Sequence, residues 1–347
     1  MDVLLLILSF VVILSGAELL TNGIEWFGRK LELAEGAIGS VLAAVGTALP
    51  ETMIPLIAIL FGGGVAASEV GVGAILGAPF MLSTLAMFVS GAAVFLLRKR
   101  RASREDLVVD TGVLGHDMAY FFGTYGLAAG VALLPVELEW ARRGACVLLL
   151  AAYGWYVVGH LRAEAAEHDE LSPLRFHKLD RRAPAHPEHP RLRIVTVQVL
   201  FALACIVGGA WGFVHAIEDL SSGLGLDGRL LALVIAPIAT ELPEKLNSVI
   251  WIRQGKDTLA MGNITGAMVF QSAIPTSVAL LFAPALWSVS GAGVAFASAG
   301  ITFASSAAIL LPMVIRRRLD ARVLMIGGLF YALYVGLVVA TLASPAG

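Results

Sequence analysis

Ten apolar segments, each about as long as the hydrocarbon core of a bilayer is thick, constrain the fold of this chain most. They are centred near residues 13, 48, 84, 124, 151, 204, 240, 273, 302 and 332. An α-helix needs about 20 predominantly apolar residues to span a membrane. Because 58% of the 347 residues are hydrophobic and only 14% are charged, a soluble core cannot account for these segments. The sequence therefore predicts an all-α polytopic membrane protein with about ten transmembrane helices.

The basic residues are distributed unevenly between alternate loops. When loops and termini are assigned in turn to two sides, 20 of the 24 lysines and arginines fall on one side. Such an excess marks the cytoplasmic side of a membrane protein. We therefore expect a multi-pass protein of the cell (cytoplasmic or inner) membrane with both termini outside. The net charge of −2 gives no reason to expect nucleic acid as a partner.

One long polar segment separates the fifth and sixth spans. It contains four histidines, at 168, 177, 186 and 189, whose spacing matches no compact metal-ligand pattern. A solvated, partly disordered cytoplasmic connection is therefore expected in preference to a regulatory metal site. The predicted organisation is a first five-helix repeat over 1–162, a polar linker over 163–192 and a second five-helix repeat over 193–347.

An internal repeat supports this division. Residues 16–51 align with 209–244 at a constant offset of 193, without a gap, and 12 of the 36 positions are identical. Both copies end in Thr-x-Leu-Pro-Glu. Because each half has an odd number of predicted spans, the halves must enter the membrane from opposite sides, which is the inverted-repeat architecture of many secondary transporters. The substrate site is expected where the repeats meet, near the midplane.

The repeated motif has the chemistry of a cation site. Its proline frees the carbonyl four residues earlier, and a freed carbonyl at membrane depth needs a cavity or an ion. Thr47 precedes Glu51 by four residues, as Thr240 precedes Glu244, so each hydroxyl shares a helix face with its carboxylate. Such oxygen ligands suit a hard cation such as Ca²⁺ or Na⁺. Two neighbouring glutamates repel unless a cation or protons neutralise them, which favours exchange. The alternative is a protonated pair that only packs the helices.

Several neighbouring residues admit two interpretations. Glu241 is a further candidate ligand, but Lys245 follows it at the spacing of an intrahelical ion pair. His116 and Asp117 fall near the cytoplasmic end of the fourth span, where they would permit a proton relay. Glu25 lies toward a span end, where solvation is expected.

Two glycine pairs occur at corresponding positions in the third span of each half. Gly73 and Gly77 in the first half match Gly262 and Gly266 in the second. Small-residue helix packing is the favoured interpretation of both pairs. Close approach of the backbone to the ion is the alternative.

The segments Gly46-Thr-Ala-Leu-Pro-Glu51 and Ala239-Thr-Glu-Leu-Pro-Glu244 resemble the paired α-repeats of the cation/Ca²⁺ exchanger (CaCA) superfamily, which includes the sodium/calcium exchangers. The resemblance covers nearly the whole chain. It implies a secondary-active antiporter that exports Ca²⁺ against Na⁺ or H⁺ by alternating access, with Glu51 and Glu244 as central ligands and Thr47 and Thr240 in support. It further implies inorganic cations and the lipid bilayer as partners, with no cofactor, nucleic acid or obligate protein partner.

The sequence departs from the superfamily pattern at several polar positions. Ala48 and Glu241 replace the motif serines, and Asn263 alone survives among the polar residues of the glycine segments; Ala78, Pro79, Ala267 and Met268 stand at the others. Fewer oxygen ligands and an added carboxylate favour proton coupling. The alternatives are a monovalent cation/proton antiporter and a degenerate, non-transporting homologue that acts as a sensor or scaffold. An intramembrane enzyme is not expected, because the chain shows no nucleophile or His-Glu-x-x-His motif and no deep histidines at ligand spacing.

Overall fold

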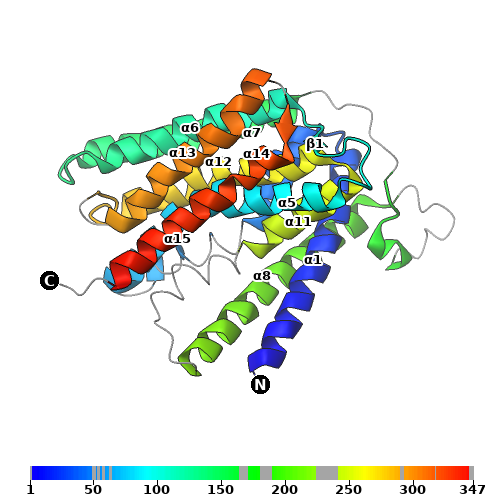
Figure 1. The fold of residues 1–347 in the computed structure, drawn as a ribbon, viewed down its shortest axis with the longest axis horizontal. Helices are drawn as coiled ribbons and strands as arrows, with labels where there is room; N and C mark the ends of the chain where they lie inside the picture. The colour runs from blue at the N-terminus through cyan, green and yellow to red at the C-terminus, as the bar shows by residue number, and fades with distance from the viewer. Residues whose placement is uncertain are drawn as a thin grey trace.

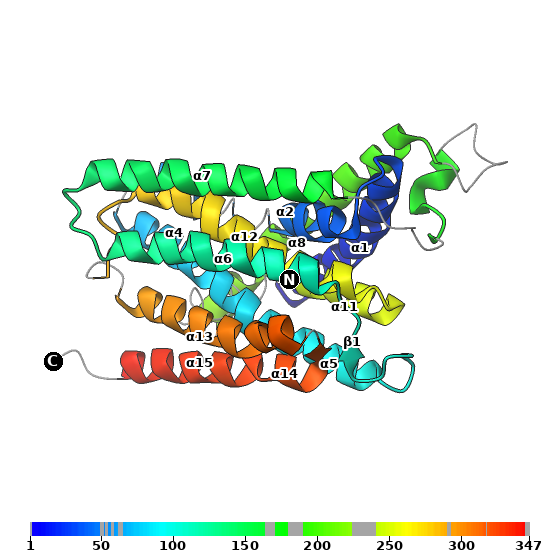
Figure 2. The same ribbon diagram turned by 90° about the horizontal axis from the view of Figure 1, so that it is seen from above.

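The chain forms a bundle of long helices (Figures 1 and 2). The computed structural model describes residues 2–48, 52, 55–56, 59–61, 65–163, 171–179, 190–223, 241–289, 293–316 and 318–343. The first half contains α1 (Asp2–Lys30), η1 (Ala37–Ala43), α2 (Ala44–Thr47), α4 (Val65–Met81), η2 (Leu82–Ala86), α5 (Met87–Leu97), β1 (Asp106–Leu107), α6 (Thr111–Ala132) and α7 (Glu139–Arg162). The remainder contains η3 (Arg175–Leu179), α8 (Leu192–Gly223), α11 (Leu242–Gln254), α12 (Asp257–Phe282), α13 (Gly293–Arg316), β2 (Leu319–Asp320), α14 (Ala321–Met325) and α15 (Gly327–Ala343).

The helices occupy the positions that hydropathy predicts. Six described helical segments are long and apolar enough to cross a membrane: 4–30, 71–97, 139–162, 192–209, 257–282 and 296–313. Shorter apolar helices cover 37–47 and 321–337. The predicted spans near residues 48 and 240 are described only in part, because 49–51 and 224–240 lie outside the described residues. The all-α polytopic class is therefore confirmed.

The helices α1 and α8 lie side by side and pack through symmetric glycine contacts (Figure 1). A Cβ atom at Gly16 would lie 3.2 Å from the carbonyl oxygen of Ala202. One at Gly209 would lie 3.2 Å from the carbonyl oxygen of Ser9. Both Gly16 and Gly209, and Ser9 and Ala202, are separated by the sequence offset of 193. The first helices of the two halves therefore contact each other as a pseudo-symmetric pair. They can approach closely because glycine has no side chain at either contact.

A second symmetric pair of contacts lies deeper in the bundle. Thr124 of α6 contacts Ser272 of α12 through their hydroxyl oxygens, which lie 2.6 Å apart. Ser305 of α13 donates to Ser83 of η2 at 2.9 Å. Ser83 and Ser272 correspond at the offset of 189 that the glycine pairs define. The fourth span of each half therefore packs on the third span of the other half.

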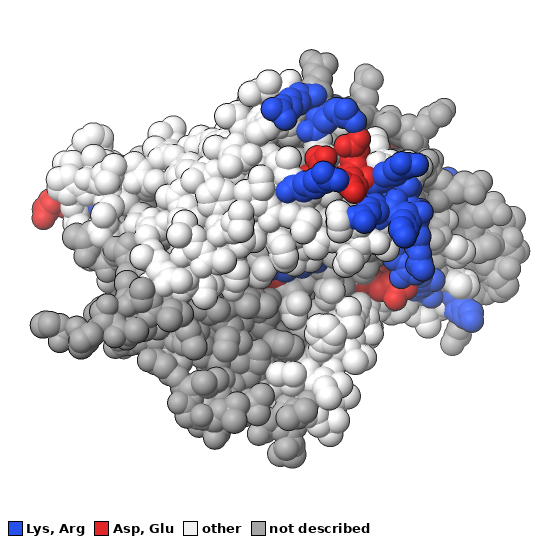
Figure 3. Space-filling model, viewed as in Figure 1, with Lys and Arg blue, Asp and Glu red and all other residues white. Residues whose placement is uncertain are grey.

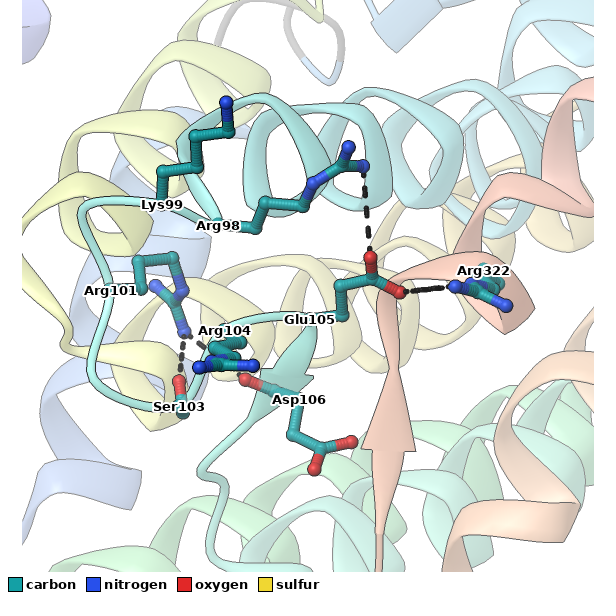
Figure 4. A pocket seen from close by; sticks show the side chains of 8 residues that line it. All are labelled: Arg98, Lys99, Arg101, Ser103, Arg104, Glu105, Asp106 and Arg322. Atoms are coloured by element: carbon teal, nitrogen blue, oxygen red, sulfur yellow. Dashed lines mark hydrogen bonds and ion pairs between the residues drawn. The ribbon is translucent and has the colours of Figure 1, made fainter.

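Basic side chains gather at one end of the molecule (Figure 3). There β1 pairs antiparallel with β2, so that the loop after α5 meets the segment after α13. A pocket of about 680 Å³ opens at this end (Figure 4). Glu105 lies between Arg98 and Arg322 in that pocket, at 3.7 and 2.9 Å. These contacts bring the basic loops together as the charge distribution predicts; the side of the membrane that they face stays a prediction.

Part of the linker contacts the helices, which the sequence did not indicate. Residues 171–179 lie against the ends of α1 and α8, and Leu174 is fully buried. Asn22 accepts from the backbone N–H of Arg175 at 3.0 Å, and Trp26 donates to the carbonyl of Ser172 at 2.9 Å. Side chains on α1 therefore supply hydrogen-bond partners for the backbone of this segment, which is anchored through Leu174 while most of its residues stay exposed or partly exposed.

The expectation of a solvated Glu25 is wrong. Its side chain on α1 is buried and accepts from the indole N–H of Trp251 at 2.8 Å. It also forms an ion pair with Lys256, between α11 and α12. A buried carboxylate is tolerated when it is paired and hydrogen-bonded, and these contacts tie α1 to the second-half hairpin described next.

Candidate cation site

The second copy of the motif lies where a helix begins. Glu241 immediately precedes α11, whose first turn contains Glu244. At its other end, Gly255 has a φ of +79°, and its N–H bonds to the carbonyl of Ile252 at 3.1 Å. Glycine adopts this left-handed conformation without the steric penalty of a side chain. The tight turn folds α12 back along α11, which brings the motif beside the polar positions of α12.

Asn263 joins the two halves at this point. Its amide nitrogen donates to the backbone carbonyl of Glu244 at 3.2 Å. Its amide oxygen lies 3.2 Å from the hydroxyl of Thr47, which can donate to it. All three residues are fully buried. One polar side chain of the second half therefore connects the second motif with the threonine of the first, where sequence analysis places the repeat interface.

The face of α11 that carries Glu244 is polar and buried. Asn247 is fully buried, and neither of its amide atoms has a hydrogen-bond partner among the described residues. Ser248, also buried, donates to the carbonyl of Ala260 and so ties α11 to α12. An unpartnered buried amide is costly. The oxygen of Asn247 is therefore suited to a ligand that approaches this face of the helix.

Glu241 and Lys245 form the intrahelical pair that their spacing predicts. The ammonium of Lys245 lies 2.8 Å from a carboxylate oxygen of Glu241, and both side chains are buried. In this conformation the charge of Glu241 is balanced within its own helix. Cation binding by Glu241 stays a prediction.

The glycine pairs differ in the contacts that they make. A Cβ atom at Gly266 would lie 2.0 Å from the carbonyl oxygen of Ser40, and one at Gly262 2.8 Å from its hydroxyl. This pair therefore packs α12 directly on the backbone of η1, as predicted. No described atom lies within 4 Å of the equivalent position at Gly73 or Gly77. Gly262 and Gly266 pack on Gly39 and Ser40. The repeat offset of 193 relates these two residues to positions 232 and 233, which lie outside the described residues.

Two polar residues near the site were not singled out from the sequence. Gln271 of α12 donates to the hydroxyl of Thr52 at 3.3 Å, and both are buried. Thr52 directly follows Glu51 in the chain. The superfamily pattern has a polar residue at the position of Met268, and Gln271 lies one helical turn after it. A polar residue displaced by one turn was therefore the only sequence feature that could have indicated Gln271.

The structure brings together part of the predicted ligand set. Thr47 and Glu244 both contact Asn263 in one buried region. Glu241 is buried one turn before Glu244 and pairs with Lys245. Glu51, Pro50 and Thr240 lie outside the described residues. The roles of the five residues predicted as cation ligands, Thr47, Glu51, Thr240, Glu241 and Glu244, stay predictions.

The fold and this buried polar centre define the class of a multi-pass helical membrane transporter. The profile of the family described as "Sodium/calcium exchanger protein" matches residues 1–161 and 194–343. The chain belongs to this family, which is one of transporters without a prosthetic group rather than of enzymes.

Similar proteins agree with that membership. CaxA of Alkalimonas amylolytica, which is named a "putative antiporter", is 26% identical over 83% of this chain and 82% of its own length. The inner membrane protein YrbG of Escherichia coli K12 is 24% identical over 81% and 79%. The sodium-calcium exchanger NCX_Mj, in a structure soaked with Na⁺ and Sr²⁺, has a TM-score of 0.70 and 17% identity, and the match covers 99% of both chains. The ten-helix exchanger fold is thereby confirmed.

Proposed function

We propose that this chain is a secondary-active cation antiporter that exports Ca²⁺ in exchange for H⁺ or Na⁺ by alternating access. The observation that carries the proposal is the bridge of Asn263 between Thr47 and the backbone of Glu244. It joins the motifs of both halves in a buried region, as expected of transporters that bind substrate between inverted repeats. Family membership supports the same reaction class.

The proposed ligands are Glu51 and Glu244 at the centre, with Thr47 and Thr240 in support. Glu241 completes the set, and Lys245 balances its charge in the conformation described. Carboxylate and hydroxyl oxygens match the preference of Ca²⁺ for hard donors. Protons bound by the same carboxylates would compete with the cation, so one site would serve both ions in turn.

Proton coupling is favoured over Na⁺ coupling. Ala78, Ala267 and Met268 are buried at positions where the superfamily pattern has side-chain oxygens. An alanine or methionine there supplies no hard ligand for several Na⁺ ions. A proton needs only the carboxylates, so a reduced ligand set is compatible with H⁺ exchange.

The proposed arrangement in the membrane has two five-helix repeats, over 1–162 and 193–347, joined by a cytoplasmic linker over 163–192. Both termini face outward from a cytoplasmic or inner membrane. The uneven distribution of basic residues supports this orientation.

Transport by reconstituted protein tests the proposal. The protein is reconstituted into proteoliposomes, and an H⁺ or Na⁺ gradient is imposed across their membrane. Uptake of radioactive Ca²⁺ is then compared with uptake of K⁺ and Na⁺. We expect Ca²⁺ flux that requires one of the gradients and that is lost in Glu51→Gln and in Glu244→Gln.

A matched control distinguishes a site effect from a general loss of acid groups. Glu18→Gln neutralises an exposed glutamate on α1 that pairs only with Arg175 among the described contacts, and it should transport normally. Folded protein without Ca²⁺ flux under either gradient would exclude Ca²⁺ as substrate. Gradient-driven K⁺ or Na⁺ flux in its place would identify a monovalent cation/proton antiporter, whereas no flux of any ion would favour a non-transporting homologue.

A further inference from the structure

A second polar cluster lies in α6 and α7, at the end of the bundle that carries the basic loop. Asp110 caps α6 by accepting from the N–H groups of Gly112 and Val113 at 2.8 and 3.2 Å. This cap fixes the start of the helix. It sets Asp117 two turns farther in, where its carboxylate is fully buried.

The two carboxylate oxygens of Asp117 face different partners. Oδ2 accepts from the hydroxyls of Ser40 at 2.8 Å and Thr265 at 2.5 Å. Oδ1 lies 2.9 Å from Nε2 of His160 and 3.0 Å from the hydroxyl of Tyr156, both on α7. One oxygen is thus held by η1 and α12, while the other is directed at imidazole and phenol groups.

His116 completes the cluster. Its Nδ1 lies 3.4 Å from Nε2 of His160. One ligand atom from each of His116, Asp117 and His160 lies within 4.8 Å of the other two. Nothing in the sequence indicated this contact, because helix packing joins two histidines that are 44 positions apart.

We propose that His116, Asp117 and His160 form a binding site for a divalent transition-metal ion such as Zn²⁺, separate from the transport site. Two imidazoles and one carboxylate are the ligands of many three-residue zinc centres. Ligands at about 2.1 Å from a tetrahedral ion are about 3.4 Å apart, which is the separation of the two histidine nitrogens. Nε2 of His160 and Oδ1 of Asp117 are 2.9 Å apart, so they would separate by about 0.5 Å when the ion binds. Oδ1 would bind the ion.

The surroundings of Asp117 have the form of an outer coordination shell. Ligating carboxylates in metal sites are themselves hydrogen-bonded, which orients them and tunes their basicity. Ser40 and Thr265 supply this support at Oδ2. Imidazole ligands favour Zn²⁺ over Ca²⁺, which prefers oxygen. The partly exposed His116 gives an ion access from the surface, whereas His160 and Asp117 are buried.

Direct metal binding tests the site. The parent for this test is a variant in which glutamine replaces each of the four linker histidines, so that the linker cannot bind Zn²⁺ through them. Excess Ca²⁺ is added to saturate the proposed transport site. Equilibrium dialysis should then give one Zn²⁺ per chain, and X-ray absorption at the zinc edge should show two imidazole ligands. His116→Ala and His160→Ala should each abolish this binding, and Ser40→Ala should weaken it by about 10–100-fold.

His215→Gln is the matched control, since it removes the one other histidine of the parent and should retain binding. His116→Ala removes a partly exposed side chain, so its melting temperature should stay near that of the parent even if His160→Ala folds poorly. A parent without bound Zn²⁺, or Zn²⁺ binding that survives His116→Ala, would overturn the proposal. In that case the cluster would be an ion-paired hydrogen-bond network only.

Discussion

Equivalent positions beside the two copies of the motif make similar contacts but differ in charge. In the first half the hydroxyl of Thr52 donates to the carbonyl of Ala48 at 2.6 Å. At the equivalent positions of the second half, the ammonium of Lys245 lies 3.4 Å from the carbonyl of Glu241 and 2.8 Å from its carboxylate. A neutral contact in one half is thus matched by a buried ion pair in the other. The halves share a fold but differ in electrostatics.

The same contrast recurs at the packing of the fourth spans. Thr124 and Ser305 make equivalent contacts with the opposite half. Seven residues before each of them stand Asp117 and Ser298, both buried. The first half therefore carries a buried carboxylate at the position where the second half carries the hydroxyl of Ser298.

The largest expected effect concerns the ion pair of the second half. Lys245→Met leaves the carboxylate of Glu241 buried without its partner, which typically costs about 3–5 kcal/mol. The double variant Glu241→Gln/Lys245→Met removes both charges and should recover most of the loss. Thermal unfolding in detergent, followed by tryptophan fluorescence, measures both. Equal melting temperatures for the single variant and the wild type would mean that the pair contributes nothing.

The next effect compares the equivalent positions 117 and 298. Asp117→Asn, studied in the presence of a chelator, replaces charge-assisted hydrogen bonds and should cost about 2–3 kcal/mol. Ser298→Ala removes one neutral hydroxyl and should cost about 0.5–1.5 kcal/mol. Melting temperatures of the two variants provide the comparison. Similar losses at both positions would contradict the electrostatic difference between the halves.

A smaller effect tests how far the packing symmetry extends. Gly266→Ala places a methyl group against the backbone of Ser40, so the helices must separate at a cost of about 1–3 kcal/mol. Gly77→Ala meets no described atom and should be nearly neutral. The yield of folded protein and its melting temperature measure both. An equal loss at Gly77 would indicate that residues 232–233 pack there as Ser40 does on Gly266.

Sequence reasoning predicted those features that depend on one helix or on the repeat. Hydropathy located the spans, and helical spacing predicted the pair of Glu241 with Lys245. The repeat offset relates the contacts of Gly16 to those of Gly209, although the sequence did not predict the contacts themselves. Each of these depends on periodicity or on a fixed separation along the chain.

Features that depend on packing between distant helices were missed. The docking of Leu174 and the burial of Glu25 both require partners on other elements. Likewise, nothing local indicates that His116 meets His160. A buried polar residue at a span end has the same sequence signal as a solvated one, because only tertiary contacts decide its environment.

The smallest effect concerns the hydroxyl pairs that join the halves. Thr124→Val and Ser305→Ala each remove one interhelical hydrogen bond and should cost about 0.6 kcal/mol, a typical value for such bonds within a membrane. Each is combined with a second substitution at its partner, Ser272→Ala or Ser83→Ala, in a double-mutant cycle. Because the contacts are related by pseudo-symmetry, we expect similar coupling energies in both cycles. A coupling energy in one cycle and none in the other would restrict the symmetry of the halves to the backbone, and would place the difference between them in side-chain contacts at this depth as well as at the motifs.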